Sequence, residues 1–335
     1  MPSSQASSRS PADPLRFALT LPLIAAPMLR VSGPELVSAA CRAGIIGAFP
    51  TVNARTPEGL DAWMTRIAED CQRAQDQGIG PIGPVCPNLI MRRPADELQA
   101  DLEVLIRHRV QLVVASVGSP APVIAPLHDA GCTVFADVAT LRHAEKALQA
   151  GADGLVLLSA GAGGQTGWVN GFSFVRAVRA MFDGPIILSG GINDGAALWA
   201  AEVLGADLCM MGTRFIATPE SMAVPGYKQM LVDSRLDDVL LTKAFTGLET
   251  NMLRPSIVAC GLNPDELQPL SEAAARERFS AQRLKQDQGP QRWVDIWSAG
   301  HSVSGVQAVT PVQDLVREIT AEYEAARQAT RKRLS

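Results

Sequence analysis

The chain has few of the residues that mark disulfide-stabilised, metal-binding or nucleic-acid-binding proteins. Only four histidines occur in 335 residues, and the six cysteines are scattered with no Cys-x-x-Cys pair and no cluster of metal ligands. Scattered cysteines within apolar runs favour a reducing, cytoplasmic location. The formal net charge of −4 provides no broad attraction to nucleic acid or to an anionic membrane. No apolar run approaches the ~20 residues that a membrane-spanning helix requires.

The chain is long and rich in apolar residues. With 335 residues, of which 47% are hydrophobic, it can bury one large core, so we expect one main domain. Residues 1–14 are rich in serine and proline and contain no apolar stretch. They predict a disordered tail rather than a signal peptide.

Short apolar runs alternate with longer segments of helical periodicity from residue 21 onward. Runs without charge predict strands that are buried on both faces. Three of the helical segments end at a glycine, namely Gly44, Gly151 and Gly205, which is typical of a helix stop. Eight such units in a row predict a (β/α)8 TIM barrel with its active site at the carboxyl ends of the strands. The predicted strands are residues 23–26, 45–49, 79–85, 112–116, 133–137, 154–158, 186–189 and 208–211.

Glycine follows directly after the seventh and eighth predicted strands. Gly190 and Gly191 follow the seventh strand, and Gly212 follows the eighth. Glycine permits positive φ and close approach, so the amide groups of two neighbouring turns can converge on an anion. Barrels of this kind usually bind phosphate after strands 7 and 8. We therefore predict a phosphate-binding site at these turns, although two ordinary strand-to-helix turns would give the same pattern.

The alternation of strands and helices stops after the eighth unit. Residues 220–290 combine helical, polar and glycine-punctuated pieces without the barrel period. An insertion after the eighth strand would overhang the mouth of the barrel, so we predict a lid or small second domain over residues 220–290. The barrel would comprise residues 15–219 and 291–335, ending in a helix from about residue 311 to residue 331.

Five motifs occur in a recognisable order along the chain. They are Ala-Ala-Pro-Met at 25–28, Pro-Asn-Leu at 87–89, Gly-Ala-Asp-Gly at 151–154 with Ala-Gly-Gly-Gln-Thr-Gly at 162–167, Ser-Gly-Gly-Ile at 189–192, and Met-Gly-Thr-Arg-Phe-Ile-Ala-Thr-Pro-Glu-Ser at 211–221. Over roughly residues 20–230 the chain thus resembles the nitronate monooxygenase family, once called 2-nitropropane dioxygenases. The resemblance implies an oxidoreductase that oxidises alkyl nitronates with O2.

Other functions stay open on the same scaffold. Flavin-dependent enoyl reductases and quinone reductases look similar, so an NAD(P)H-dependent reductase is one alternative. A flavin-binding protein without turnover is another. The expected partners are a small-molecule substrate and O2, with neither nucleic acid nor membrane, and a homo-oligomer stays open.

The resemblance also implies FMN, bound without a covalent link. Its phosphate would lie on the backbone at the two glycine turns, which agrees with the anion site predicted from the glycines alone. From the residues alone, Asn88 can equally be a turn residue, Pro27 and Met28 can be strand-end packing, and the glycines after strand 6 can form a plain turn. The residues that the resemblance places at the flavin are Ala26, Pro27, Met28, Asn88, Gly163, Gly164, Gly190, Gly191, Met211, Gly212 and Thr213.

One departure from the family pattern concerns catalysis. The family carries histidine, the proposed base, where this chain has Gln165. A carboxamide forms hydrogen bonds but does not titrate near neutrality, so Gln165 can hold a substrate oxygen without taking a proton. His301, in a late Ser/Gly loop, is either a replacement base or a surface histidine. Asp137 is predicted to contact substrate, with a polar strand end as the alternative. Lys243 and Arg254 are predicted to meet an anionic substrate or a nicotinamide phosphate, with a solvated charge as the alternative for each.

Overall fold

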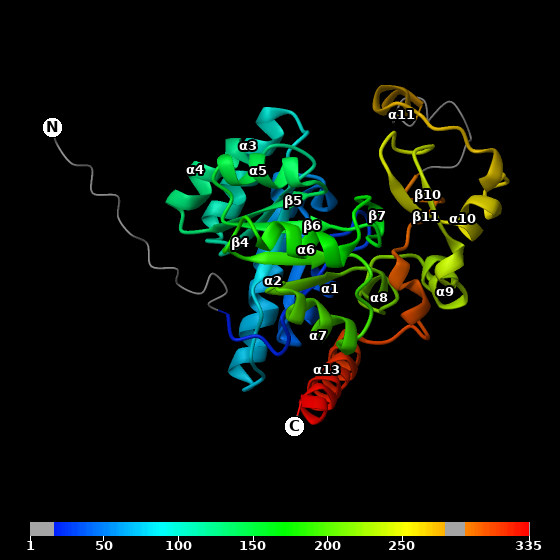
Figure 1. Cartoon of the computed structure of the whole chain (residues 1–335). Helices are drawn as coiled ribbons and strands as arrows, with labels where there is room; N and C mark the ends of the chain where they lie inside the picture. The colour runs from blue at the N-terminus through cyan, green and yellow to red at the C-terminus, as the bar shows by residue number, and fades with distance from the viewer. Residues whose placement is uncertain (1–16, 279–291, 335) are drawn as a thin grey trace.

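The computed structural model describes residues 17–278 and 292–334. The predicted tail and residues 279–290 of the predicted lid lie outside those ranges. Eight parallel strands close into a barrel in the order β1-β2-β3-β4-β5-β6-β8-β9, and β9 pairs with β1. Helices surround the barrel (Figure 1). The predicted (β/α)8 TIM barrel is confirmed.

The bounds of the elements follow the predicted units with one exception. The barrel strands are β1 Leu23–Ala25, β2 Ile46–Pro50, β3 Val85–Ile90, β4 Leu112–Ser116, β5 Thr133–Val138, β6 Gly154–Leu158, β8 Ile186–Ser189 and β9 Leu208–Met211. The helices around them are α1 Pro34–Arg42, α2 Pro57–Asp76, α3 Ala95–Arg107, α4 Ala121–Asp129, α5 Leu141–Gln149, α6 Gly171–Arg179, α7 Gly195–Leu204, the short α8 Thr213–Ile216 and the final α13 Val312–Leu334, with the 3-10 helices η1 Thr51–Ala54 and η4 His301–Gly305. Within the described ranges, no helix has the length and apolar character needed to cross a membrane.

The third strand is the exception, because the prediction of residues 79–85 was wrong. Pro81 and Pro84 lie in that segment and have no amide hydrogen to donate to a ladder. Pairing with β2 begins only at Val85, opposite Gly47. Asn88 therefore lies within a strand, opposite Val114 of β4, rather than in a turn after a strand.

Alternate residues of each strand point into the barrel, where eleven buried residues form an apolar cluster. Val114 and Phe135 belong to this cluster. Two positions further toward the carboxyl end, the residues that point the same way are Ser116 and Asp137. The equivalent position on β3 is Asn88. The interior thus changes from apolar to polar at the mouth of the barrel, on the side of β3, β4 and β5.

Repeated Gly-Ala-Asp sequences close the opposite, amino-terminal end of the barrel. Gly151 and Gly205 end α5 and α7 with φ of 97° and 108°, which only glycine adopts readily. Two residues later, the carboxylate of Asp153 accepts a hydrogen bond from an amide of β5 at 2.8 Å. Asp207 does the same for the first amide of β8 at 2.7 Å. Each sequence therefore stops a helix and ties the next strand to its neighbour.

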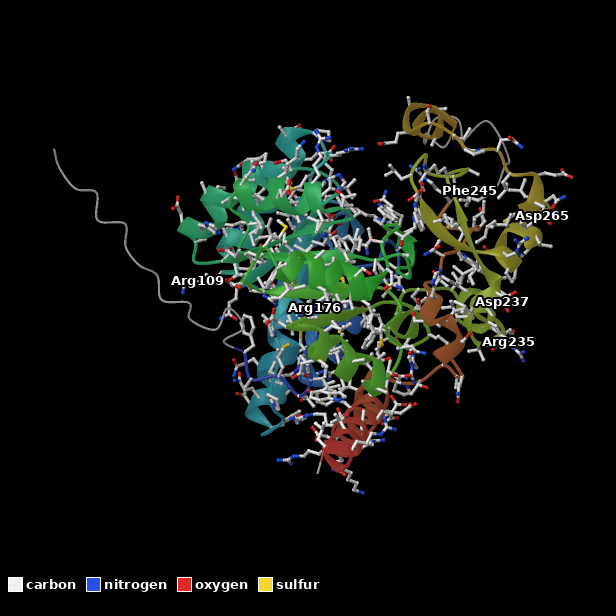
Figure 2. The ribbon with its side chains drawn as sticks, in the orientation of Figure 1. Arg109, Arg176, Arg235, Asp237, Phe245 and Asp265 are labelled. Carbon is white, nitrogen blue, oxygen red and sulfur yellow. The ribbon has the colours of Figure 1, made fainter. Side chains whose placement is uncertain are left out.

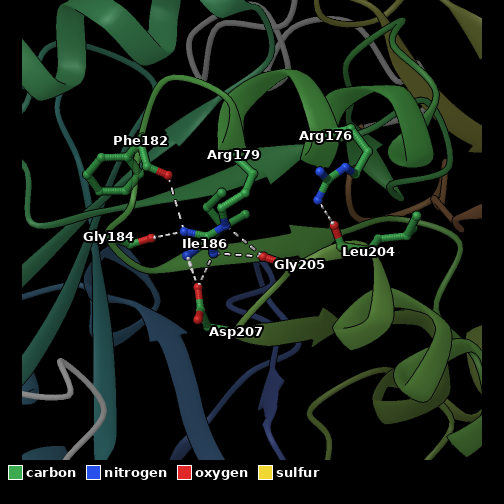
Figure 3. Close-up of polar contacts among 8 residues, drawn as sticks. All are labelled: Arg176, Arg179, Phe182, Gly184, Ile186, Leu204, Gly205 and Asp207. Carbon is green, nitrogen blue, oxygen red and sulfur yellow. Dashed lines mark hydrogen bonds and ion pairs between the residues drawn. The ribbon is translucent and has the colours of Figure 1, made fainter.

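Arg179, at the end of α6, extends this arrangement (Figure 3). Its guanidinium donates hydrogen bonds to the carbonyls of Phe182 at 3.2 Å, Gly184 at 2.7 Å and Gly205 at 2.7 Å. It also pairs with the carboxylate of Asp207 at 2.6 Å. These contacts fix the amino ends of β8 and β9. The same two strands carry the glycine turns at their carboxyl ends.

A second, smaller sheet follows the barrel in the chain. Its order is β10-β11-β7, and β7 (Gly164–Gln165) comes from the loop after β6. Figure 1 shows β7 on the side of the barrel that faces β10 and β11. The sequence did not predict these two strands. The elements after β9 are α9 Pro225–Asp233, η2 Leu236–Asp238, β10 Val239–Thr242, β11 Thr250–Leu253, α10 Arg254–Ala259, η3 Pro264–Glu266 and α11 Glu272–Arg278.

Candidate functional site

A cavity of about 410 Å³ lies at the carboxyl ends of the barrel strands. Its wall includes most residues that the sequence indicated, together with side chains from the small sheet and the loop before α13. Met211, Lys243 and His301 are not part of the wall. The predicted residues that line it are Ala26, Pro27, Met28, Asn88, Asp137, Gly163, Gly164, Gln165, Gly190, Gly191, Gly212 and Thr213.

The turn after β8 forms an open backbone cradle on one side of the cavity. Gly190 and Gly191 have φ of 114° and 77°. A Cβ on Gly190 would lie 2.5 Å from the amide nitrogen of Ala162, whereas a Cβ on Gly191 would have no neighbour within 4 Å. Among the described residues, the amides of Gly190, Gly191 and Thr213 donate no hydrogen bond. Free amides beside open space suit an anionic group such as a phosphate.

The loop after β6 is fixed beside this cradle. The side-chain amide of Asn251, a fully buried residue of β11, donates to the carbonyls of Ala160 and Ala162 at 3.0 and 2.7 Å. A Cβ on Gly163 would lie 2.7 Å from the amide nitrogen of Gly300, so only glycine permits this packing. The sequence gave no sign of the contribution of Asn251, because its partners lie about ninety residues away.

The turn after β1 is also braced by residues that the sequence did not indicate. The hydroxyl of Ser32 donates to the carbonyl of Ala26 and accepts from the amide of Met28, both at 3.0 Å. The side chain of Asn53 donates to the carbonyls of Met28 and Ser32, both at 2.9 Å. The backbone from Ala26 to Met28 is thereby held against the cavity.

Asn88 is oriented by the neighbouring strand. Its amide nitrogen donates to the carbonyl of Val114 at 3.1 Å, and its amide oxygen accepts from the hydroxyl of Ser116 at 3.1 Å. Asn88 is buried and lines the cavity. Because it lies within β3, the alternative of a turn residue does not hold.

Asp137 brings a carboxyl group to the same side of the cavity. Its Oδ1 accepts a hydrogen bond from the amide of Val117 at 3.2 Å. Burial raises the pKa of Asp137 to about 7. Val117 has φ of 55°, a left-handed conformation that costs a β-branched residue on the order of 1–3 kcal/mol. The strained backbone of Val117 and the carboxyl group with the raised pKa are thus hydrogen-bonded to each other, and both features are common at functional sites.

The loops that carry Gln165 and His301 contact each other, but only the first of these two residues lines the cavity. Gln165 lies opposite Thr250 in the small sheet and lines the cavity. The amide of His301 donates to the carbonyl of Gly161 at 3.0 Å, but its side chain is exposed and lies outside the cavity wall. The next residue, Ser302, lines the cavity instead. The side chain of His301 is therefore not placed to act there.

Met211 packs on the outside of the barrel rather than at the cavity. It belongs to the apolar cluster between the strands and the helices, whereas Met210 belongs to the interior cluster and lines the cavity. Successive residues of a strand point to opposite faces, so a site residue predicted one position away falls on the wrong side.

The two predicted cations of the small sheet also lie outside the cavity wall. Lys243 is paired with Glu249 at 3.6 Å, and its side chain is about half exposed. Arg254 is paired with Asp265 at 2.8 Å. Asp265 lies at the edge of this part of the molecule that faces away from the barrel (Figure 2). Both cations match the alternative of a solvated charge.

Aromatic and charged side chains that the sequence did not single out complete the wall. The rings of Tyr227 and Trp297 stack 5.0 Å apart at 12°, and the Tyr227 hydroxyl donates to the carbonyl of Ser298. Burial raises the pKa of Tyr227 to about 12. Arg92, in the loop after β3, pairs with Glu272 of α11, and both line the cavity.

A barrel with a backbone cradle of free amides, an oriented amide and a partly buried carboxyl group at its mouth defines a small-molecule enzyme of the TIM-barrel class. Residues 84–322 match the family model described as nitronate monooxygenase. The chain belongs to this family. It is an oxidoreductase of a family of flavin enzymes.

Known proteins agree with this assignment over most of the chain. A nitronate monooxygenase of Paraburkholderia phytofirmans is 27% identical, covering 92% of this chain and 94% of the relative. FabK from Thermotoga maritima superposes with a TM-score of 0.79 at 26% identity, covering 96% of this chain and 97% of that one. A nitroalkane oxidase from Streptomyces ansochromogenes gives a TM-score of 0.75 at 26% identity, covering 93% and 98%.

Proposed function

We propose that this protein binds FMN without a covalent link and oxidises alkyl nitronates with O2 to a carbonyl compound and nitrite. The observation that carries the proposal is the single cavity that joins the glycine cradle to Gln165 and Asn88. The cradle suits a terminal phosphate, and the oriented polar groups suit a flat heterocycle and a small polar substrate. Membership of the family supports the reaction class.

The residues present fit FMN. The amides of Gly190, Gly191 and Thr213 would hold its phosphate, since they donate no hydrogen bond within the described ranges and the space beside Gly191 is open. The backbone of Ala26 to Met28 and the side chain of Asn88 would face the ring. When bound, FMN supplies the electron-transfer chemistry.

The protein's own side chains orient the substrate and exclude water. The carboxamide of Gln165 can donate a hydrogen bond to a nitro oxygen. The stacked rings of Tyr227 and Trp297 present an apolar surface beside it. We also propose that residues 220–290 act as a lid over this site, because Tyr227, Thr246 and Glu272 from that segment line the cavity. A cytoplasmic location is proposed from the six cysteines, all of which are free.

Anaerobic titration of the purified protein tests the proposal. Mixing with a preformed alkyl nitronate should bleach the flavin absorbance, and admission of O2 should restore the colour and release nitrite. Bleaching by NAD(P)H, with turnover of an enoyl or quinone substrate and no response to nitronate, would contradict it and identify a reductase. Tight FMN with no response to either donor would identify a flavin-binding protein.

A further inference from the structure

A neutral nitroalkane must lose its α-proton before it can react as a nitronate, and this chain has no histidine on the cavity wall. Five ionisable side chains line the cavity within the described ranges. The two arginine side chains have only donor groups, and Tyr227 donates its hydroxyl hydrogen to a carbonyl. Glu272 is paired with Arg92. The remaining ionisable group is the carboxyl of Asp137.

We propose that Asp137 is the catalytic base that converts neutral nitroalkanes into nitronates in this cavity. The inference rests on the proposed nitronate oxidation and extends its substrate class to the neutral form. In the step, the α-carbon–hydrogen bond breaks and the proton moves to a carboxylate oxygen of Asp137. The electron pair of that bond delocalises onto the nitro group, and no oxidant is consumed.

The position of Asp137 supports this role. It lies two residues beyond Phe135 on β5 and lines the cavity at the barrel mouth, as Asn88 and Ser116 do. The amide of Val117 engages Oδ1, and no other hydrogen bond or ion pair of the described residues engages the carboxyl group. Oδ2 is therefore left for a substrate hydrogen.

The surroundings of Asp137 keep it from being a permanent anion. The inward neighbours on β3 and β4, Asn88 and Ser116, are uncharged, and those on β6, Val156 and Leu158, are apolar. The charged groups on the same cavity wall are Arg92, Glu272 and Arg292. Burial raises the pKa of the carboxyl group to about 7, which is the range in which a general base is most effective near neutral pH.

The decisive experiment compares the two substrate forms in the holoenzyme and in Asp137→Asn. For a neutral nitroalkane, we expect kcat/KM to fall by roughly 10²–10⁴-fold, the usual contribution of a general base. Oxidation of the preformed nitronate, which needs no deprotonation, should fall by far less than oxidation of the nitroalkane. In the wild type, kcat/KM for the nitroalkane should rise with pH and level off above about 7. The variant should lose this inflection.

A second readout does not depend on flavin turnover. Under anaerobic conditions in D2O, NMR should show that the wild type exchanges the α-hydrogens of a nitroalkane faster than Asp137→Asn does. If Asp137→Asn does not fold, Asp137→Ala is used instead. Added formate should restore exchange in that variant, because its carboxylate can replace the missing side chain.

Three results would overturn the inference. One is equal loss with both substrate forms, a second is unchanged exchange in the variants, and a third is loss of nitroalkane activity in His301→Ala. If the wild type oxidises nitronate but not nitroalkane, Asp137 is not the base while the proposed function stands. If nitronate is not oxidised at all, the proposed function itself fails.

Discussion

The two ends of the barrel use opposite kinds of chemistry. At the amino end, charged side chains stabilise the fold. Arg179 and Asp207 bind strand ends and each other, and Asp153 pairs with His128 at 2.8 Å. At the carboxyl end, free amides surround Gly191 and the Asp137 carboxyl group keeps one oxygen without a described partner. In TIM barrels, stability and catalysis are separated in this way. Changes at each end should therefore have separate effects.

The largest expected effect is loss of flavin from Gly191→Val. Gly191 has φ of 77° with open cavity beside it, so valine adds strain of about 1–3 kcal/mol and places methyl groups where a phosphate would lie. Gly131→Val is the matched control, because Gly131 has φ of 80° and open space but lies at the amino end. Absorbance and thermal melting should show similar destabilisation in both and flavin loss only in the first. Equal flavin content in the two would disprove the cradle.

Arg179→Ala should destabilise the fold without changing the site. Several charge-assisted hydrogen bonds to carbonyls and to Asp207 disappear, so we expect a loss of roughly 2–4 kcal/mol in the free energy of unfolding. Activity per bound flavin should stay the same. Urea denaturation and flavin-normalised assays check this, and a changed KM would show that the two ends are coupled.

Asp137 should make the protein less stable as pH rises through the acid range. Its pKa is about 7 in the folded protein and close to the ordinary aspartate value of 3.8 in the unfolded chain, so between these values the folded state binds more protons. Stability attributable to this residue therefore falls from pH 4 toward pH 7 and is constant above. Urea unfolding of flavin-free Asp137→Asn should show a flatter pH dependence than the wild type. A parallel pair of curves would rule out a raised pKa.

The smallest effects are expected from His301→Ala and Lys243→Ala. Both side chains lie outside the cavity wall, and Lys243 forms a largely solvated ion pair worth at most about 1 kcal/mol. Flavin content and the KM for nitronate should match those of the wild type. A several-fold shift in KM for either variant would place that side chain at the substrate after all.

What the sequence could and could not predict follows from periodicity. Repeated glycine stops and uncharged runs are sufficient to indicate eight βα units. A run that is buried on both faces has no alternation, however, so nothing in the sequence of β9 tells that Met210 rather than Met211 points inward. The Val-Leu-Leu-Thr of β10 also lacks alternation, although its residues are only partly buried or exposed, so the sequence did not predict this strand. The third strand begins only after Pro81 and Pro84, because these prolines have no amide hydrogen for the ladder, which the apolar content of residues 79–85 does not reveal.

Site residues were predictable where the backbone makes the site and less so where side chains do. Glycine identity reveals the cradle because no other residue suits its conformation. Ser116, Asn53 and Asn251 are common polar residues whose roles depend on partners far away in the chain. The sequence likewise does not show the direction of the His301 side chain, which is exposed to solvent although its loop packs beside the site.

Strand β7 connects Gln165 to both the barrel and the small sheet. By sequence this residue belongs to the barrel, but its ladder partner is Thr250, and Asn251 holds the backbone just before it. A displacement of the small sheet would therefore carry Gln165 with it, while Asn88 and Asp137 stay with the barrel strands. Amino-acid changes in β11, which pairs with β7, can thus alter the distance between the Gln165 carboxamide and the barrel mouth. None of the residues of β11 belongs to the glycine turns after β8 and β9, so such changes would act first on the Gln165 side of the cavity.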